Sequence, residues 1–279
     1  MTGKKLLPLC LCLGLLLTGC ATVAEYTSPT PPLGQEATAT PTPGPESSAP
    51  APSEATPRPG PEWGEQVYMT SYVVQDRSEP VFSPEYRLPK ITNAQGIPAY
   101  EAINDYYAGA LDDLAVSAAE LSGFAVEDYS IAQSLGDPFF NYVDSETFVL
   151  SLSTPSRVCV LRTHVSNLGN PHPLNYPLAD TFDLATGARL SFADLFTCSA
   201  EEARERVLSA VLARNAASGY SGVVLEEEQL RQGFDPEKFY LTEDSLVVYY
   251  PQGTLSSALG SPTFAVPYTE LEDIFAPWQ

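Results

Sequence analysis

Histidine and cysteine are scarce in this sequence, and with them the side chains that build most metal centres and histidine-based active sites. The 279 residues include 2 histidines and 5 cysteines, and neither their number nor their spacing suits a zinc site. A GxSxG nucleophile motif is missing, and so is an Asp/Asn-rich calcium loop with a glycine at its sixth position. We therefore expect no metal, no cofactor, no catalytic residue and no enzyme activity.

Basic side chains are scarce as well. Lys and Arg number 14 against 35 Asp and Glu, which gives a net charge of -21 at pH 7. Nucleic-acid binding needs a basic surface, so the charge argues against a nucleic-acid partner. A strongly acidic surface attracts basic proteins and speeds their association. The charge therefore favours a basic protein as the partner.

Long apolar runs are missing apart from one near the N-terminus. Residues 6–17 are apolar but too short to span a bilayer, and they lie between Lys4 and Lys5 and a Leu-Thr-Gly-Cys sequence that ends at Cys20. This order is typical of a bacterial lipoprotein signal, in which residues 1–19 are removed and Cys20 receives a lipid. An ordinary secretory signal with a chance cysteine is the alternative. Two acyl chains such as palmitate anchor a protein stably, so we expect attachment to the extracytoplasmic side of the cell membrane.

Residues 20–62 are predicted to form a lipid-anchored, disordered linker. They are rich in Pro, Ser and Thr and have few large apolar side chains, so they cannot bury enough surface to offset the entropy of ordering. The sequence TPTPGP at residues 40–45 favours extended polyproline II. We interpret the segment as a spacer between membrane and folded part, with a Pro-rich ligand for another domain as the alternative.

The rest of the sequence predicts an α+β fold with antiparallel sheet. Apolar residues spaced three and four apart predict one long helix over residues 100–121 in the N-terminal half. Capping boxes that begin at Ser191, Ser199 and Thr269 predict two or three helices in the C-terminal half. Strands are predicted over residues 66–74, 85–91, 129–135, 147–153, 157–165, 180–184, 239–242, 245–250 and 263–266. Helices and strands thus occur in blocks, which favours α+β. We expect domains over residues 63–175 and 176–279, joined as one continuous sheet or standing apart.

Three sequence stretches in the C-terminal half resemble the domain-of-unknown-function family 3298. They are FDLATGARLSFADLF at residues 182–196, FYLTEDSLVVYY at 239–250 and PTFAVPYTELEDIF at 262–275. Residues 63–165 are similar to the companion family 4163, with a strand pair and a long helix. The turn that usually joins the two families reads GGAH, whereas this sequence has Gly-Asn-Pro-His ending at His172.

The resemblance implies a domain pair outside the cell. Such pairs occur in lysozyme-sensing anti-sigma factors, beside the catalytic domain of peptidoglycan deacetylases, and in stand-alone lipoproteins. By this analogy His172 is a candidate for a binding surface. Glu226, Glu227 and Glu228 form an acidic run that we interpret as a solvated helix face, available to a basic partner.

His164 and the two cysteines Cys159 and Cys198 are the other side chains with possible chemical roles. His164 lies in a predicted strand without an activated nucleophile nearby in the sequence, so we expect no catalytic role for it. Cys159 and Cys198 are expected as separate buried thiols, with a disulfide as the alternative because the extracellular side permits one.

The sequence therefore predicts a membrane-anchored, non-enzymatic binding module in the cell wall. Its expected partner is lysozyme, another basic wall-directed protein, or peptidoglycan. A peptidoglycan-associated enzyme accessory and a structural part of a larger envelope assembly are the alternatives.

Overall fold

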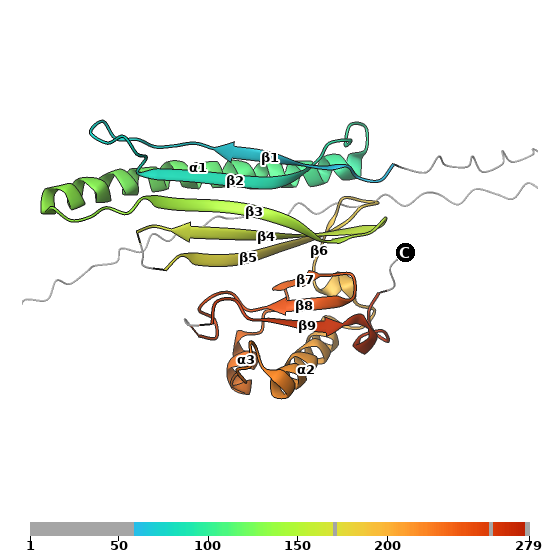
Figure 1. Ribbon diagram of the computed structural model, residues 1–279. Helices are drawn as coiled ribbons and strands as arrows, with labels where there is room; N and C mark the ends of the chain where they lie inside the picture. The colour runs from blue at the N-terminus through green and yellow to red at the C-terminus, as the bar shows by residue number, and fades with distance from the viewer. Residues whose placement is uncertain (1–58, 170–171, 257–258, 277–279) are drawn as a thin grey trace, which may run out of the picture. The chain divides into compact units, whose positions relative to one another are not determined.

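The computed structural model describes residues 59–169, 172–256 and 259–276. Their larger sheet has six strands in the order β1-β2-β3-β4-β5-β6 (Figure 1). The strands are β1 (Trp63–Met69), β2 (Phe82–Ile91), β3 (Tyr142–Ser153), β4 (Arg157–Asn167), β5 (Leu174–Asp183) and β6 (Arg189–Leu190). Neighbouring strands are antiparallel except β2 and β3, which are parallel because a helix carries the chain back between them.

The long helix α1 (Pro98–Leu135) packs on the larger sheet, alongside β1 and β2 in Figure 1. Its buried stripe begins with Tyr100, Ile103 and Tyr107, as the sequence spacing predicts, and continues through Ala118 and Ala125. These side chains form two apolar clusters with residues of β2, β4 and β5. The helix thus covers the face of the sheet on which the candidate site lies.

The predicted strand over residues 129–135 is wrong, because these residues form the last turns of α1. The helix ends at Gly136, which takes a left-handed conformation (φ 73°), and backbone N–H groups there return to carbonyls of the last turn. Tyr129 packs edge-on against the ring of Phe139, which also holds these turns.

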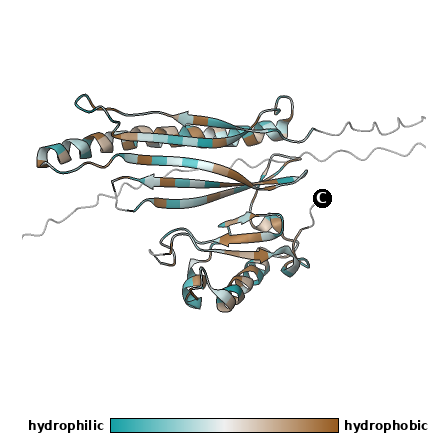
Figure 2. Cartoon of the chain, viewed as in Figure 1, coloured by the Kyte–Doolittle hydropathy of each residue, from teal (hydrophilic) through white to brown (hydrophobic). Residues whose placement is uncertain are grey.

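The C-terminal part has its own three-stranded antiparallel sheet, in the order β7-β8-β9. It comprises β7 (Phe239–Leu241), β8 (Ser245–Tyr249) and β9 (Thr263–Pro267), with helices α2 (Ala200–Ser218) and α3 (Glu227–Gly233) and the 3₁₀ turn η1 (Ala193–Leu195). Every residue of β8 is buried, and Figure 2 shows the hydrophobic colour concentrated in this sheet. Its core also includes Leu152 of β3 and Cys159 of β4, so the opposite face of the larger sheet packs against it.

The α+β class is confirmed, with one long helix in the N-terminal half and two α-helices in the C-terminal half. The predicted helix that begins at Thr269 is wrong: the chain there forms a short 3₁₀ turn, η2 (Tyr268–Glu270). Instead, Phe275 pairs with Phe196 in a β-bridge, and the carbonyl of Ile274 accepts a hydrogen bond from Thr197. These backbone hydrogen bonds take the place of the hydrogen bonds that a helix would have formed within itself.

The expected domain boundary between residues 175 and 176 falls inside β5. The division into domains stays a prediction. In the part of the chain that is described, no helix is both long and apolar enough to cross a membrane. Cys20 and nearly all of the predicted linker lie outside the described residues.

Candidate functional site

A row of charged side chains lies on the face of the larger sheet that α1 covers. Alternate residues of a strand point to the same face, so Arg162 and His164 of β4 follow Val158 and Val160, which pack in the core beneath α1. The neighbouring strands add charges to this row that are almost completely buried: Asp144, Glu146 and Asp180. Charged side chains are rarely buried without partners, so each of these groups is expected to have an oppositely charged or hydrogen-bonding partner nearby.

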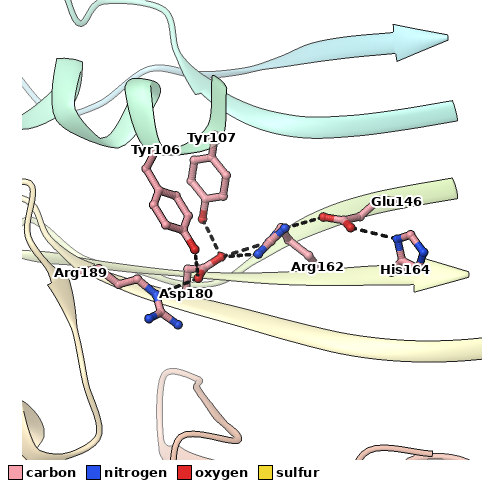
Figure 3. A network of polar contacts seen from close by, with 7 residues as sticks. All are labelled: Tyr106, Tyr107, Glu146, Arg162, His164, Asp180 and Arg189. Carbon is pink, nitrogen blue, oxygen red and sulfur yellow. Dashed lines mark hydrogen bonds and ion pairs between the residues drawn. The ribbon is translucent and has the colours of Figure 1, made fainter. Parts of the chain in front are cut away.

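Arg162 joins the carboxylates of two neighbouring strands (Figure 3). Its Nη1 donates to Oε1 of Glu146 at 2.6 Å, and its Nε donates to Oδ2 of Asp180 at 3.0 Å. The other oxygen of Asp180 accepts hydrogen bonds from Nε of Arg189 at 2.9 Å and from the hydroxyl of Tyr106 at 2.7 Å. Tyr106 comes from α1, so this network links the helix to the sheet.

His164 lies between two carboxylates. Its Nε2 is 3.0 Å from Oδ1 of Asp144, and its Nδ1 is 3.1 Å from Oε2 of Glu146. Burial, the largest effect, lowers the pKa of His164, but hydrogen bonds and charges of the two carboxylates outweigh it and raise the pKa to about 9. His164 is therefore an imidazolium at neutral pH.

The ring of His164 also stacks on that of Tyr86, which donates a hydrogen bond to Asp144. The ring of Tyr86 is 6.5 Å away and nearly parallel, and its hydroxyl donates to Oδ2 of Asp144 at 2.6 Å. Burial raises the pKa of Asp144, but hydrogen bonds from His164 and Tyr86 hold it below its usual value. Asp144 is therefore ionised and bonded through both oxygens.

The charges of this network balance. Three carboxylates stand against three cations when His164 is protonated: Asp144, Glu146, Asp180, Arg162, His164 and Arg189. Each oxygen of the three carboxylates has a partner within the network. General acid–base catalysis needs a side chain that can exchange a proton with a substrate. Here the carboxylate oxygens and both ring nitrogens of His164 already contact partners within the network. The network suits a role in holding β3, β4, β5 and α1 together.

A pocket of about 540 Å³ opens beside the network. Its lining comes from α1, β3, β4, β5 and the two ends of the β7–β8 hairpin, and includes Arg162, His164, Tyr176, Leu178, Lys238 and Pro251. β6 pairs with Thr181 and Phe182, so among the described residues no further strand pairs with the part of β5 that lines the pocket. The described residues contain no group of three or more His, Cys, Asp or Glu arranged to hold a metal ion.

His172, Glu226, Glu227 and Glu228 were the residues expected at a binding surface, and all four are exposed. His172 is exposed just before β5. Glu226, Glu227 and Glu228 are exposed where α3 begins; Glu227 pairs with Arg231 at 2.8 Å, and no hydrogen bond or ion pair among these described residues joins His172 to the glutamates.

Cys159 and Cys198 carry free, separate thiols rather than the alternative disulfide; Cys159 is buried as expected, whereas Cys198 is only half-buried. The sulfur of Cys159 is buried and lies 3.3 Å from the backbone nitrogen of Leu241, which donates to it. This contact joins β4 of the larger sheet to β7 of the smaller one.

The sequence interpretation missed the buried network. Residues 142–146 lie outside the predicted strands, since the strand predicted nearest to them begins at residue 147, whereas β3 begins at Tyr142. Strand periodicity could have revealed the network. Asp144 and Glu146 form a D-x-E pattern before one hydrophobic run, and the next run contains an R-x-H pattern at residues 162–164. In neighbouring strands these two patterns put opposite charges on one face of the sheet.

Residues 193–269 match the family model described as "Protein of unknown function (DUF3298)". The fold resembles the crystal structure of a member of this family from Bacteroides fragilis, with a TM-score of 0.62 and 15% sequence identity over 78% of this chain and 95% of that chain. It also resembles a DUF3298 family protein from Pseudomonas aeruginosa, with a TM-score of 0.52 and 14% identity over 79% of this chain and 96% of that one. No curated protein matches the sequence. The chain thus carries a DUF3298 module over residues 193–269, within a fold shared by solved structures of that family.

Proposed function

We propose that this protein is a lipid-anchored binding module on the extracytoplasmic side of the membrane, without enzyme activity, that engages a basic wall-directed protein such as lysozyme. In this proposal Cys20 carries the lipid and residues 20–62 act as the spacer. The partner is attracted by the acidic surface of the folded part, including Glu226, Glu227 and Glu228.

The observation that carries the proposal is the closed charge balance of the interior. The buried carboxylates are matched by Arg162 and His164, which are largely buried, and by Arg189, whose side chain is 47% exposed. The network takes up three of the chain's 35 acidic residues and two of its 14 Lys and Arg, so 32 acidic and 12 basic residues, a net charge of -20, remain outside it. A surface of one sign raises the encounter rate with an oppositely charged partner.

The same closure supports a role without catalysis. An imidazole that acts as a base needs a free nitrogen within reach of a substrate, whereas both ring nitrogens of His164 contact carboxylates. The resemblance of residues 63–165 to family 4163, and of the pair to the extracellular part of lysozyme-sensing anti-sigma factors, supports lysozyme as the basic partner.

Equilibrium binding to a basic lysozyme tests the proposal. The protein is produced from residue 20 with Cys20→Ser, so that it keeps the whole compact unit Pro57–Gln279. We expect a Kd in the micromolar range or tighter at about 0.02 M salt, and weaker binding at about 0.15 M as screening increases. Absence of binding at both salt concentrations would refute lysozyme as the partner and favour a structural role in the envelope.

A further inference from the structure

The pocket beside the network has two charged side chains that the protein leaves without partners. Lys238, just before β7, and Asp113 of α1 both line it. Neither makes an ion pair or a side-chain hydrogen bond with another described residue, and the two do not pair with each other. Every other charged group in the lining belongs to the closed network. The pocket therefore offers one free cation and one free anion.

The scarcity of lysine makes this placement specific. The whole chain has four lysines, and the described residues contain only Lys90 and Lys238. Lys90 is exposed on β2, whereas Lys238 is half-buried at the pocket. In a chain with a net charge of -21, an uncompensated ammonium at a concave site favours an anionic group there.

The rest of the wall is mainly apolar. Ala110 and Leu114 of α1 and Leu178 of β5 line the pocket together with Pro177 and Pro251. The ring of Tyr176 lies 6.3 Å from that of His164, and its hydroxyl has no hydrogen-bond partner among the described residues. The volume of about 540 Å³ lies within the range of about 300–1,000 Å³ that small-molecule sites occupy.

We infer that this pocket binds a short peptide with two free ends, whose carboxylate pairs with Lys238, whose ammonium pairs with Asp113 and whose apolar side chain lies against Leu114 and Leu178. A dipeptide supplies opposite charges at its two ends with a small apolar body between them, which is the complement of the pocket. Its one peptide group can also form a hydrogen bond with the hydroxyl of Tyr176. The inference goes beyond the proposed function, because neither the lipid anchor nor lysozyme binding enters it.

Calorimetric titration of the protein from residue 20, with Cys20→Ser, provides the test. The ligands are Ala-Leu, its C-terminal amide, N-acetyl-Ala-Leu and D-Ala-D-Ala. We expect Ala-Leu or D-Ala-D-Ala to bind with a Kd below about 1 mM, and the amide and the acetylated form of Ala-Leu to bind at least tenfold more weakly than Ala-Leu itself. Preference for D-Ala-D-Ala would identify wall peptides as the source, and preference for Ala-Leu would identify peptides cleaved from proteins.

Matched variants separate the two charges. Lys238→Met is expected to lose at least tenfold in affinity for the preferred peptide, while Lys90→Met, the other described lysine, is expected to bind as the parent does. Asp113→Asn is expected to weaken the binding of Ala-Leu and to leave the binding of N-acetyl-Ala-Leu unchanged, because only Ala-Leu has an ammonium group. An unchanged thermal unfolding midpoint in Lys238→Met shows that any loss comes from the pocket.

The inference is overturned if neither Ala-Leu nor D-Ala-D-Ala binds below about 1 mM. It is also overturned if the amide binds as well as the free acid, or if Lys238→Met binds as the parent does. These results leave the lysozyme proposal untouched, since that proposal is tested with a different partner.

Discussion

The guanidinium of Arg162 lies 2.6 Å from the carboxylate of Glu146, and the two side chains are only 11% and 1% exposed. They come from neighbouring strands, displaced by two positions in register, since Glu146 lies opposite His164. Removal of two charges from water is costly, so this pair is stable only because each partner compensates the other.

Arg162→Met is therefore expected to destabilise the fold by about 3–5 kcal/mol, because it leaves three buried carboxylates facing only two cations, His164 and Arg189. The free energy of unfolding in urea measures the effect. Arg231→Met is the matched control: it removes an exposed ion pair with Glu227 within α3 and should cost about 0.5 kcal/mol or less. Equal losses in the two variants would show that the buried network does not behave as a closed set of charges.

The pKa of His164 predicts how stability depends on pH. Its pKa is about 9 in the folded protein and 6.5 as the ordinary value, so folding favours the protonated ring. The contribution is fully present below pH 6.5 and is lost as the pH rises through about 9. We expect the stability difference between the parent and His164→Gln to shrink over this interval in urea unfolding. A difference that is constant from pH 6 to pH 10 would contradict the raised pKa.

The part of α1 up to residue 121 was predictable, but its last turns were not. Tyr100, Ile103 and Tyr107 are large and recur at helical spacing, so the stripe is visible in the sequence. Beyond residue 121 the buried position is Ala125, whose small side chain gives a weak apolar signal. Residues 129–135 alternate like a strand, and only packing of Tyr129 on Phe139 and the left-handed Gly136 favour the helix.

The candidate site was less predictable than the fold for a related physical reason. Asp144 and Glu146 can be buried because Arg162 and His164 of another strand pair with them. The residue pattern within a single strand contains no information about partners on another strand. The acidic run at Glu226 was predictable as an exposed helix face because α3 begins there and its glutamates need no buried partner. The pocket at Lys238 was not, because its lining combines α1 and β3–β5 with the two ends of the β7–β8 hairpin, which lie far along the chain from them.

Gly187 closes the turn between β5 and β6 with a left-handed backbone (φ 76°), a conformation that glycine adopts without steric cost. Gly187→Ala is expected to destabilise the protein by more than about 1 kcal/mol, because a side chain strains this conformation and its Cβ would overlap the backbone of Ala99. Gly109→Ala, in the middle of α1 with open space around it, should instead stabilise by about 0.5–1 kcal/mol. The same sign for both substitutions in urea unfolding would contradict this.

Cys20→Ser tests the lipid anchor directly. If Cys20 carries two acyl chains, the variant should leave the membrane fraction, because no other anchor is proposed. Fractionation and immunoblotting of cells that express either form measure this. Cys159→Ser is the control for loss of a thiol and should stay in the membrane fraction. Membrane retention of Cys20→Ser would refute lipid attachment at this residue.

The most direct test of the account compares a surface variant with an interior variant in their association with lysozyme. Glu226→Gln, Glu227→Gln and Glu228→Gln together remove exposed charge at the start of α3, whereas His164→Gln changes the buried network. Stopped-flow association at about 0.02 M salt should be slower for the triple variant and unchanged for His164→Gln, because steering acts through the surface charge. Slower association in His164→Gln with an unaffected triple variant would contradict the claim that the surface, and not the buried network, carries the function.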